Sequence, residues 1–290
     1  MNVNIFSFSG VYNDQDFWRI PGDGIRFFDL TDIGGTNGYL SDEARNAIRE
    51  RIAASPVDAV NFIDSGNTHY MTDILCRRNG VPFALVLIDN HTDMQAPAFG
   101  GLESCGSWVR FALEMNPMLT GVLIIGPGEA SAREAWGEDV KPYEDGGAAD
   151  ADVMPVSDTI CVKYNGKPVV LLPEEYADKD RVSGCMDMLS GSCSVSGAGP
   201  EGIYLSIDKD ILSRDELVTN WDQGNMSPEV LAGILGGICD KAGKKLLGVD
   251  ICGECPPQAQ YSGDLRAYGA DLEQNNEINA KLLDIFAGCR

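Results

Sequence analysis

The sequence predicts an α/β protein with three layers, in which helices cover both faces of a mostly parallel central sheet. Short apolar runs alternate with amphipathic helical stretches along the chain, and this alternation is typical of parallel sheets. Several apolar runs carry no polar residue at alternate positions, as expected for strands covered on both faces. The chain has 290 residues, of which 44% are hydrophobic, so it is long enough to bury a large core.

The strands and helices can be placed in order along the chain. The strands expected are residues 3–8, 60–63, 83–88, 121–125, 202–207 and 245–250. The helices expected are residues 42–54, 72–79, 107–115, 228–242 and 271–286. Ser41 precedes Asp42 and Glu43, which is the pattern of a helix N-cap, and Gly80 is expected to end the second helix.

Residues 127–199 interrupt this alternation, because they are rich in Gly, Ala, Asp and Ser. Within them, residues 159–164 and 167–172 flank Asn165-Gly166, a dipeptide that predicts a tight turn between two antiparallel strands. We interpret this segment as an insertion that contains a hairpin. The chain is then expected to form one domain over residues 1–290.

Charge and hydropathy limit the classes of partner. A formal net charge of -22 argues against nucleic-acid binding, because a phosphate backbone would be repelled. It modestly favours cationic small substrates, although an acidic surface also serves solubility alone. No apolar run approaches the length of a membrane span, and the N-terminus has no signal-peptide pattern. We therefore expect a cytoplasmic protein that binds neither nucleic acid nor membrane.

Nine cysteines do not resemble a secreted disulfide framework, because the number is odd and the sites are scattered. Cys76, Cys161 and Cys239 lie in apolar segments, where we expect buried reduced thiols. Cys252 and Cys255 have the C-x-x-C spacing of redox and zinc sites. No second C-x-x-C accompanies them and they do not open a helix, so the spacing is weak evidence.

One of only two histidines lies in a segment typical of a metal site. Asp89, His91 and Asp93 occupy alternate positions directly after the expected strand 83–88. If the extended geometry continues, the three side chains leave on one face. An imidazole flanked by two carboxylates is a ligand set for a divalent cation of the manganese or zinc type.

Two further clusters follow other expected strands. His69 comes after strand 60–63, and Asp208 and Asp210 come at the end of strand 202–207. In an open parallel sheet, ligands bind outside the carboxyl ends of the strands. Each cluster alone could be a turn, a helix cap or a hydrogen-bonded histidine. Together they supply two imidazoles and four carboxylates, which are enough for two metal ions that share carboxylates.

These motifs resemble those of the arginase/agmatinase (ureohydrolase) superfamily. The segment from Asp89 to Asp93 resembles its Asp-Ala-His-x-Asp motif, and Ser206-Ile-Asp208-Lys-Asp210 resembles its Ser-x-Asp-x-Asp motif. Residues 65–69 are similar to a degenerate Gly-Gly-Asp-His motif. Residues 250–257 resemble the late Asp-x-x-Glu-x-x-Pro element, with one extra residue before Glu254. The motifs occur in the order of the family across most of the chain.

The resemblance implies an arginase-like fold and two Mn²⁺ ions per chain, whose bridging hydroxide attacks a planar guanidinium carbon. Matching the motifs implies that one ion is bound by His69, Asp89, Asp93 and Asp208. It implies that the other is bound by Asp89, His91, Asp208 and Asp210. The resemblance also implies that Glu254 holds the guanidinium, that Asp93 belongs to the catalytic machinery, and that the chains form trimers or hexamers.

The sequence departs from the family at three places. Cys105 stands where the family has a histidine that is assigned proton shuttling, and it could be a weak acid or a packed thiol. Thr68 replaces the usual Asp before the first ligand histidine, which could alter how that imidazole is held. The loop 219–225 is also different. Its possible substrate contacts are Trp221, Asp222 and Asn225, unless the loop is only a capped turn before the helix at Pro228.

The sequence thus predicts a binuclear manganese hydrolase of a linear C–N bond in a small guanidino or amidino compound. Two alternatives remain. The missing shuttle histidine would also fit a metal-binding relative that has lost catalysis and acts as a binding or scaffold protein. An amide deacetylase on the same fold is less favoured, because the chain has the paired Asp-x-Asp and lacks adjacent histidines.

Overall fold

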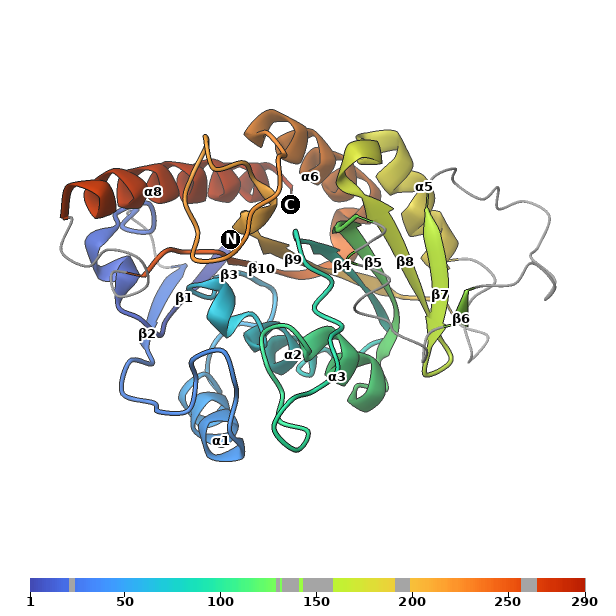
Figure 1. Ribbon diagram of the computed structural model, residues 1–290, viewed down its shortest axis with the longest axis horizontal. Helices are drawn as coiled ribbons and strands as arrows, with labels where there is room; N and C mark the ends of the chain where they lie inside the picture. The colour runs from blue at the N-terminus through green and yellow to red at the C-terminus, as the bar shows by residue number, and fades with distance from the viewer. Residues whose placement is uncertain are drawn as a thin grey trace.

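The structure, a computed structural model, describes residues 1–20, 24–128, 131, 141–142, 159–190, 199–256 and 265–289. Over these residues the chain forms a ten-stranded sheet in the order β2-β1-β3-β10-β9-β4-β5-β8-β7-β6 (Figure 1). The pairs are parallel, except for β6–β7 and β7–β8 at one edge. The strands are β1 (Asn2–Ser7), β2 (Ile25–Asp29), β3 (Ala59–Phe62), β4 (Phe83–Ile88), β5 (Leu119–Gly126), β6 (Lys141–Pro142), β7 (Ile160–Tyr164), β8 (Lys167–Pro173), β9 (Gly202–Asp208) and β10 (Leu246–Cys252).

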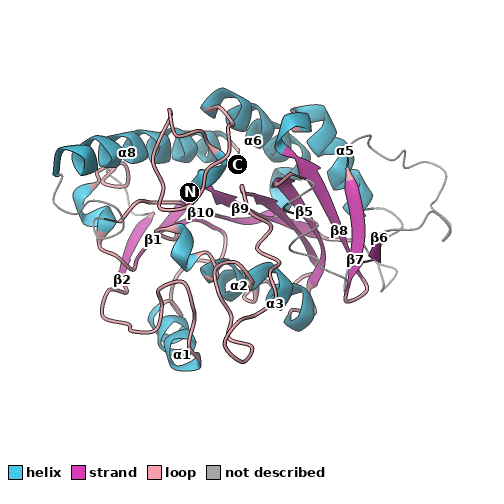
Figure 2. Ribbon diagram, in the orientation of Figure 1, coloured by secondary structure: helices cyan, strands magenta, loops and turns pink. Residues whose placement is uncertain are grey.

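Helices cover both faces of the sheet (Figure 2). One face carries α1 (Asp42–Arg51), α2 (Met71–Cys76) and α3 (Trp108–Met115). The other carries α5 (Lys179–Ser190), α6 (Pro228–Ala242) and α8 (Leu265–Gly288). The short 3-10 helices are η1 (Val11–Asp14), η2 (Gly66–Thr68), η4 (Glu174–Tyr176), η5 (Lys209–Ile211) and η6 (Gly243–Lys245). This confirms the three-layer α/β/α architecture.

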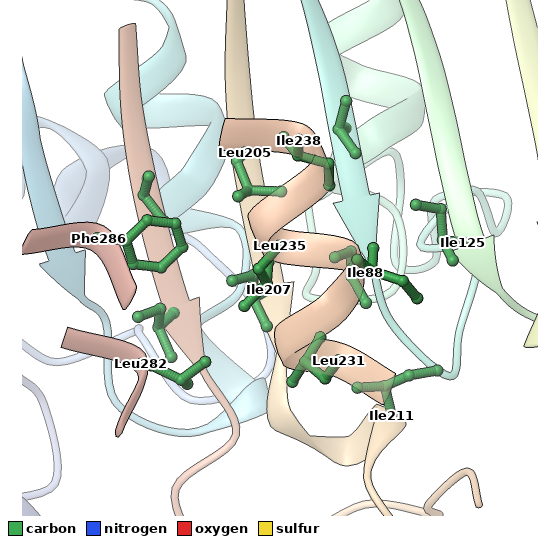
Figure 3. Packing of buried hydrophobic residues seen from close by; sticks show 14 of the residues in the cluster. Ile88, Ile125, Leu205, Ile207, Ile211, Leu231, Leu235, Ile238, Leu282 and Phe286 are labelled. Atoms are coloured by element: carbon green, nitrogen blue, oxygen red, sulfur yellow. The ribbon is translucent and has the colours of Figure 1, made fainter. Parts of the chain in front are cut away.

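The central strands are apolar without alternation because each face packs on a different helical layer. All six residues of β4 are buried. Val86 and Ile88 belong to the cluster that includes residues of α6 and α8, whereas Leu85 and Leu87 belong to the cluster with residues of α3. Figure 3 shows Ile88 and its neighbours of β9 close to the apolar face of α6. Burial of both faces makes these strands a rigid platform for the loops that follow them.

Most expected elements are confirmed. The helix 228–242 is found as predicted, and Ser41 caps α1 by accepting a hydrogen bond from the backbone of Ala44. The sequence interpretation missed β2 and α5. The edge strand β2 is only partly buried, and α5 lies in the segment interpreted as an insertion.

The Asn-Gly turn forms the expected hairpin. Asn165 and Gly166 both have positive φ and join β7 to β8. Because β8 also pairs in parallel with β5, the hairpin extends the main sheet. Much of the remaining insertion, including 132–140 and 143–158, lies outside the described residues. The single-domain organisation stays a prediction.

The cysteine interpretation needs two corrections. Cys239 is not a reduced thiol, because it forms a disulfide with Cys289, with a Cα–Cα distance of 5.4 Å. α6 and α8 pack side by side, and this brings two cysteines together that lie 50 residues apart. Cys161 is half-buried and not fully buried, whereas Cys76 is a buried free thiol.

Among the described helices, none combines the length and apolar character that a membrane crossing requires.

Candidate metal centre

The three predicted clusters converge at one edge of the sheet. The strands β3, β10, β9 and β4 are consecutive neighbours, so their carboxyl ends lie together. A pocket of about 160 Å³ opens there. Its lining includes the six residues expected as metal ligands: His69, Asp89, His91, Asp93, Asp208 and Asp210.

The segment after β4 reaches the pocket by turning. The Asp89 carboxylate accepts a hydrogen bond of 2.6 Å from the backbone of His91, and Asp93 has a φ of 49°. The expectation that the strand continues as extended chain is therefore wrong. The turn sends His91 toward Asp210 and Asp93 toward His69, so the three side chains serve two neighbouring groups.

The first group surrounds His69. Its Nδ1 atom lies 3.0 Å from Asp93 Oδ2, 3.3 Å from Asp89 Oδ2 and 3.6 Å from Asp208 Oδ2. The second group surrounds His91, whose Nδ1 atom lies 2.9 Å from Asp210 Oδ2 and 3.4 Å from Asp89 Oδ1. Asp89 therefore contacts both histidines, each through a different oxygen. Asp208 Oδ2 approaches His69, and its Oδ1 accepts the backbone N–H of Asp210 at 2.9 Å.

Hydrogen bonds behind His69 fix the ring. Ser206 donates its hydroxyl proton to Asp250 at 2.6 Å and lies 2.9 Å from Nε2 of His69. Since that proton is used, the serine oxygen accepts the Nε2–H of the imidazole. In the neutral imidazole, this hydrogen bond leaves the Nδ1 lone pair on the side of the carboxylates, which is the usual way in which neighbours orient a metal-ligating histidine.

The electrostatics show that the four carboxylates outweigh the positive charge of the group. Burial and the Asp89 carboxylate raise the pKa of Asp93 to about 6. Burial and the Asp208 carboxylate raise the pKa of Asp210 well above its usual range. Burial opposes protonation of His91, but the Asp210 and Asp89 carboxylates raise its pKa to about 12. Protons bound to the aspartates and the imidazolium of His91 partly balance the negative charge of the four carboxylates.

The residues present fit divalent cations. Oδ2 of Asp89 and Oδ2 of Asp210 are buried and have no hydrogen-bond partner, although buried carboxylate oxygens normally have one. Both oxygens face an imidazole nitrogen. Carboxylate and imidazole donors together suit manganese and zinc.

Glu254 has partners other than the expected guanidinium. It is buried, it pairs with Lys209, and it accepts hydrogen bonds from Asn279 at 2.7 Å and Gln15 at 2.6 Å. It does not belong to the pocket lining. The role predicted for Glu254 in holding a guanidinium stays a prediction. Lys209 lies between Asp208 and Asp210 in the sequence, and its side chain reaches Glu254 instead of the pocket. Its place between the two aspartates is the sequence signal that could have suggested a structural role.

Cys105 lines the pocket, as its motif position predicts. Burial and the nearby Asp93 raise its pKa to about 12, so the thiol is protonated at neutral pH. This favours a packed thiol over a weak acid. Thr68 donates to the backbone oxygens of Ile63 at 2.6 Å and Ser65 at 2.8 Å, so it closes the turn that places His69.

In the loop 219–225, Trp221 lines the pocket, and its ring lies 5.9 Å from the His91 ring. Its Nε1 donates to Asn67 at 2.9 Å. The two other predicted contacts are absent from the lining. Asp222 accepts from Asn90 through its carbonyl oxygen, and the backbone of Asn225 donates to Glu174. Both hold the loop in place.

Other wall residues were missed. They are Gly38, Tyr39, Gly66, Gln95, Ser104 and Gly106. Gly66, Ser104 and Gly106 lie in or beside stretches that resemble the family motifs, whereas the other three carry no such signal. Cys252 was also missed as a neighbour of the centre: its Sγ lies 3.1 Å from Asp208 Oδ2. Pro257 of the late motif lies outside the described residues.

Comparisons with known proteins show the same fold in enzymes. No protein-family model matches the chain. A Thermotoga maritima protein, described only as uncharacterized, is 26% identical over 282 residues, which are 97% of this chain and 88% of that protein. An arginase from Bacillus subtilis superposes with a TM-score of 0.60 at 12% identity, over 98% of this chain and 97% of that one.

Two further solved structures agree. The agmatine ureohydrolase of Thermoplasma volcanium gives a TM-score of 0.57 at 14% identity and covers 99% of this chain and 88% of that one. The proclavaminate amidino hydrolase of Streptomyces clavuligerus gives a TM-score of 0.54 at 17% identity and covers 100% of this chain and 92% of that one. The chain therefore has the arginase-like fold that its motifs predict.

Proposed function

We propose that this protein is a divergent ureohydrolase that uses two divalent cations to hydrolyse a linear C–N bond in a guanidino or amidino compound. The observation that carries the proposal is the convergence of two histidines and four aspartates in one pocket. The fold supports it, because the solved structures that share it include an arginase, an agmatine ureohydrolase and an amidino hydrolase.

The residues proposed to hold the cations form two groups that share Asp89. One group is His69, Asp89, Asp93 and Asp208, and the other is Asp89, His91 and Asp210. We keep Mn²⁺ as the cation expected from the motifs. Two cations in such a site make water a nucleophile at neutral pH and polarise the group that it attacks. The proposed position of Asp208 between both ions is expected from the motif alone.

The remaining residues of the pocket position the substrate. The Trp221 ring, 39% exposed, stands beside His91 and offers a flat apolar wall to a planar guanidinium or amidine. Trp108 donates its Nε1–H to Asp93 and keeps that carboxylate turned toward His69. Asp93 is thereby held as a proposed ligand.

The residues that line the pocket also limit which groups the amine portion of the substrate can carry. Among the described residues, no Lys or Arg lines the pocket, and Glu254 is withheld by Lys209. A substrate carboxylate would therefore find no Lys or Arg side chain among the described lining residues. Tyr39 and Gln95 provide an aromatic and a neutral polar surface instead. We therefore propose substrates whose amine portion has no carboxylate.

A second candidate is a metal-binding protein without catalysis. Two observations favour it: the position of the shuttle histidine holds the protonated thiol of Cys105, and the carboxylate of Glu254 is turned away. Both candidate functions predict metal binding, but only the hydrolase predicts turnover of a substrate.

The test uses purified protein loaded with Mn²⁺ and a panel of guanidino, amidino and formimino compounds, each with and without a carboxylate. We expect release of urea, ammonia or formamide from a carboxylate-free member. Asp210→Asn serves as the matched control and should lose the activity. Metal binding without turnover on any compound would favour the binding protein, and no metal binding would overturn both candidates.

A further inference from the structure

A thiol lies inside the proposed metal centre. Cys252 is the last residue of β10, the strand that separates β3 from β9, so it ends at the same sheet edge as His69 and Asp208. The residue is fully buried, with 0% of its surface exposed. Its Sγ lies 3.1 Å from Oδ2 of Asp208, the same oxygen that approaches His69 Nδ1.

The distances suit joint binding of one ion. One ligand atom from each of His69, Asp208 and Cys252 lies within 4.8 Å of the other two. Zinc bonds are about 2.3 Å to sulfur and about 2.0–2.1 Å to nitrogen, so two ligand atoms of one ion lie about 3–4.5 Å apart. The three side chains can meet one cation with small shifts in side-chain position.

The backbone is built for this approach. Gly253 follows Cys252 and has a φ of 95°. A Cβ atom at that position would lie 2.6 Å from Asp208 Oδ1 and 2.7 Å from the backbone nitrogen of Lys209. Any other residue would push the end of β10 away from Asp208. The Oδ2 atom of Asp89, which has no hydrogen-bond partner, lies 3.3 Å from Nδ1 of His69 in the same group.

We propose that Cys252 is a sulfur ligand of the buried metal ion, together with His69 and Asp208, and that this position selects Zn²⁺, Fe²⁺ or Co²⁺ over Mn²⁺. The inference rests on the metal centre of the proposed function and changes the identity of the buried ion. A thiolate is a soft donor, which manganese binds poorly. On binding, the Cys252 S–H bond breaks, a metal–sulfur bond forms, and the proton is released to solvent.

The alternative is that Cys252 only donates a hydrogen bond to Asp208. Serine separates the two roles, because its hydroxyl keeps the hydrogen bond but is a harder donor. Cys105→Ser is the matched control, because Cys105 is the other thiol at the pocket. Cys255→Ser tests the second cysteine of the C-x-x-C pair.

The experiment is a titration of metal-free protein with Co²⁺, followed by absorption spectroscopy. Wild-type protein should develop the near-ultraviolet sulfur-to-cobalt charge-transfer band. Cys252→Ser should bind Co²⁺ without that band, whereas Cys105→Ser and Cys255→Ser should keep it. In a competition experiment, the preference for Zn²⁺ over Mn²⁺ should fall roughly tenfold or more in Cys252→Ser. Loss of a residue that only hydrogen-bonds to a metal ligand already lowers metal affinity by about 10–100-fold, so loss of a ligand should cost at least as much.

The outcomes separate this inference from the proposed function. Binding of Co²⁺ without a charge-transfer band, or a band that survives in Cys252→Ser, overturns the sulfur ligand and leaves the metal-dependent hydrolase standing. No binding of Co²⁺, Zn²⁺ or Mn²⁺ overturns the proposed function itself. If Cys252→Ser fails to fold, X-ray absorption at the zinc edge of wild-type protein decides the matter, since a sulfur neighbour at about 2.3 Å is required.

Discussion

At the residue scale, the proposed metal centre has one imidazole in each of its two groups. His69 is held by Ser206 and Asp250, and His91 stands between Asp89 and Asp210. Both imidazoles are committed to the carboxylate groups. Proton transfer in the proposed reaction would therefore use another group, and the buried, protonated thiol of Cys105 is poorly suited to it.

Replacement of Cys105 by alanine tests that argument. A general acid or base contributes roughly 10²–10⁴-fold to a rate, so loss of a proton carrier would be obvious. We expect Cys105→Ala to keep kcat within about tenfold of wild type on any substrate that the panel identifies, because the thiol does not titrate near neutral pH. Cys105→His is the companion variant. A strong gain of activity in it would identify a chain whose catalysis had been lost, and a large loss in Cys105→Ala would contradict the packed-thiol role.

At the scale of elements, a buried ion pair joins the two strand ends that flank the pocket to the C-terminal helix. Lys209 of η5 pairs with Glu254, which follows β10, and donates to Asn275 and Asn279 of α8 at 2.7 and 2.9 Å. Both charged side chains are only 1% exposed. The pair places Asp208 and Asp210 by holding the residue between them.

Breaking this pair should destabilise the fold. Removing one partner of a buried pair costs about 3–5 kcal/mol, because the other charge is left without compensation. We expect Lys209→Met and Glu254→Gln each to lower the free energy of unfolding by an amount of that order. The double variant should lose clearly less than the sum. Urea denaturation of metal-free protein measures these changes.

The same variants test whether Glu254 is a structural residue or contacts substrate. If Glu254→Gln unfolds like wild type and instead raises KM for a guanidino compound, the carboxylate contacts substrate and the ion pair is secondary.

At the scale of the whole molecule, the proposed centre joins segments that are far apart in sequence. Its ligands follow β3, β4 and β9, so cations that bind them stabilise the middle of the sheet. Without cations, the four carboxylates are balanced only by protons and imidazolium. A ligand that binds only the folded state stabilises it in proportion to the logarithm of its concentration over Kd.

Metal removal should therefore lower the thermal stability. At a metal concentration of about 100 times Kd, the gain is roughly 2.7 kcal/mol, which corresponds to roughly 5 °C in Tm for a chain of this size. Differential scanning calorimetry with Mn²⁺ or Zn²⁺ and then with a chelator measures the shift. Asp210→Asn is the control. Its Tm should rise less than that of wild type when metal is added, because Asp210 is one of the proposed ligands. An unchanged Tm in wild-type protein would count against the centre.

The sequence was sufficient for much of the fold, because local patterns carry that information. Alternation of apolar runs with amphipathic stretches revealed the central strands, and the Asn165-Gly166 turn revealed the hairpin. The edge strand β2 and the helix α5 escaped notice, because edge strands are half-exposed and α5 has weak apolar periodicity. The pairing of Cys239 with Cys289 also escaped, because only the packing of α6 on α8 brings the two together.

For the site, the sequence by itself determined which residues occupy the strand ends. Aspartates and histidines directly after buried strands must lie at one edge of a parallel sheet, so the six proposed ligands could be named in advance. Only the tertiary structure decided what each residue faces. Contacts such as Lys209–Glu254, Cys252–Asp208 and Trp221–His91 join segments between 44 and 130 residues apart, and no local pattern encodes which way such side chains turn. The direction of a side chain is set by the neighbours that the fold brings to it. That is why the glutamate expected at the substrate lies in a buried ion pair, and why the thiol of Cys252 lies beside the proposed metal ligands.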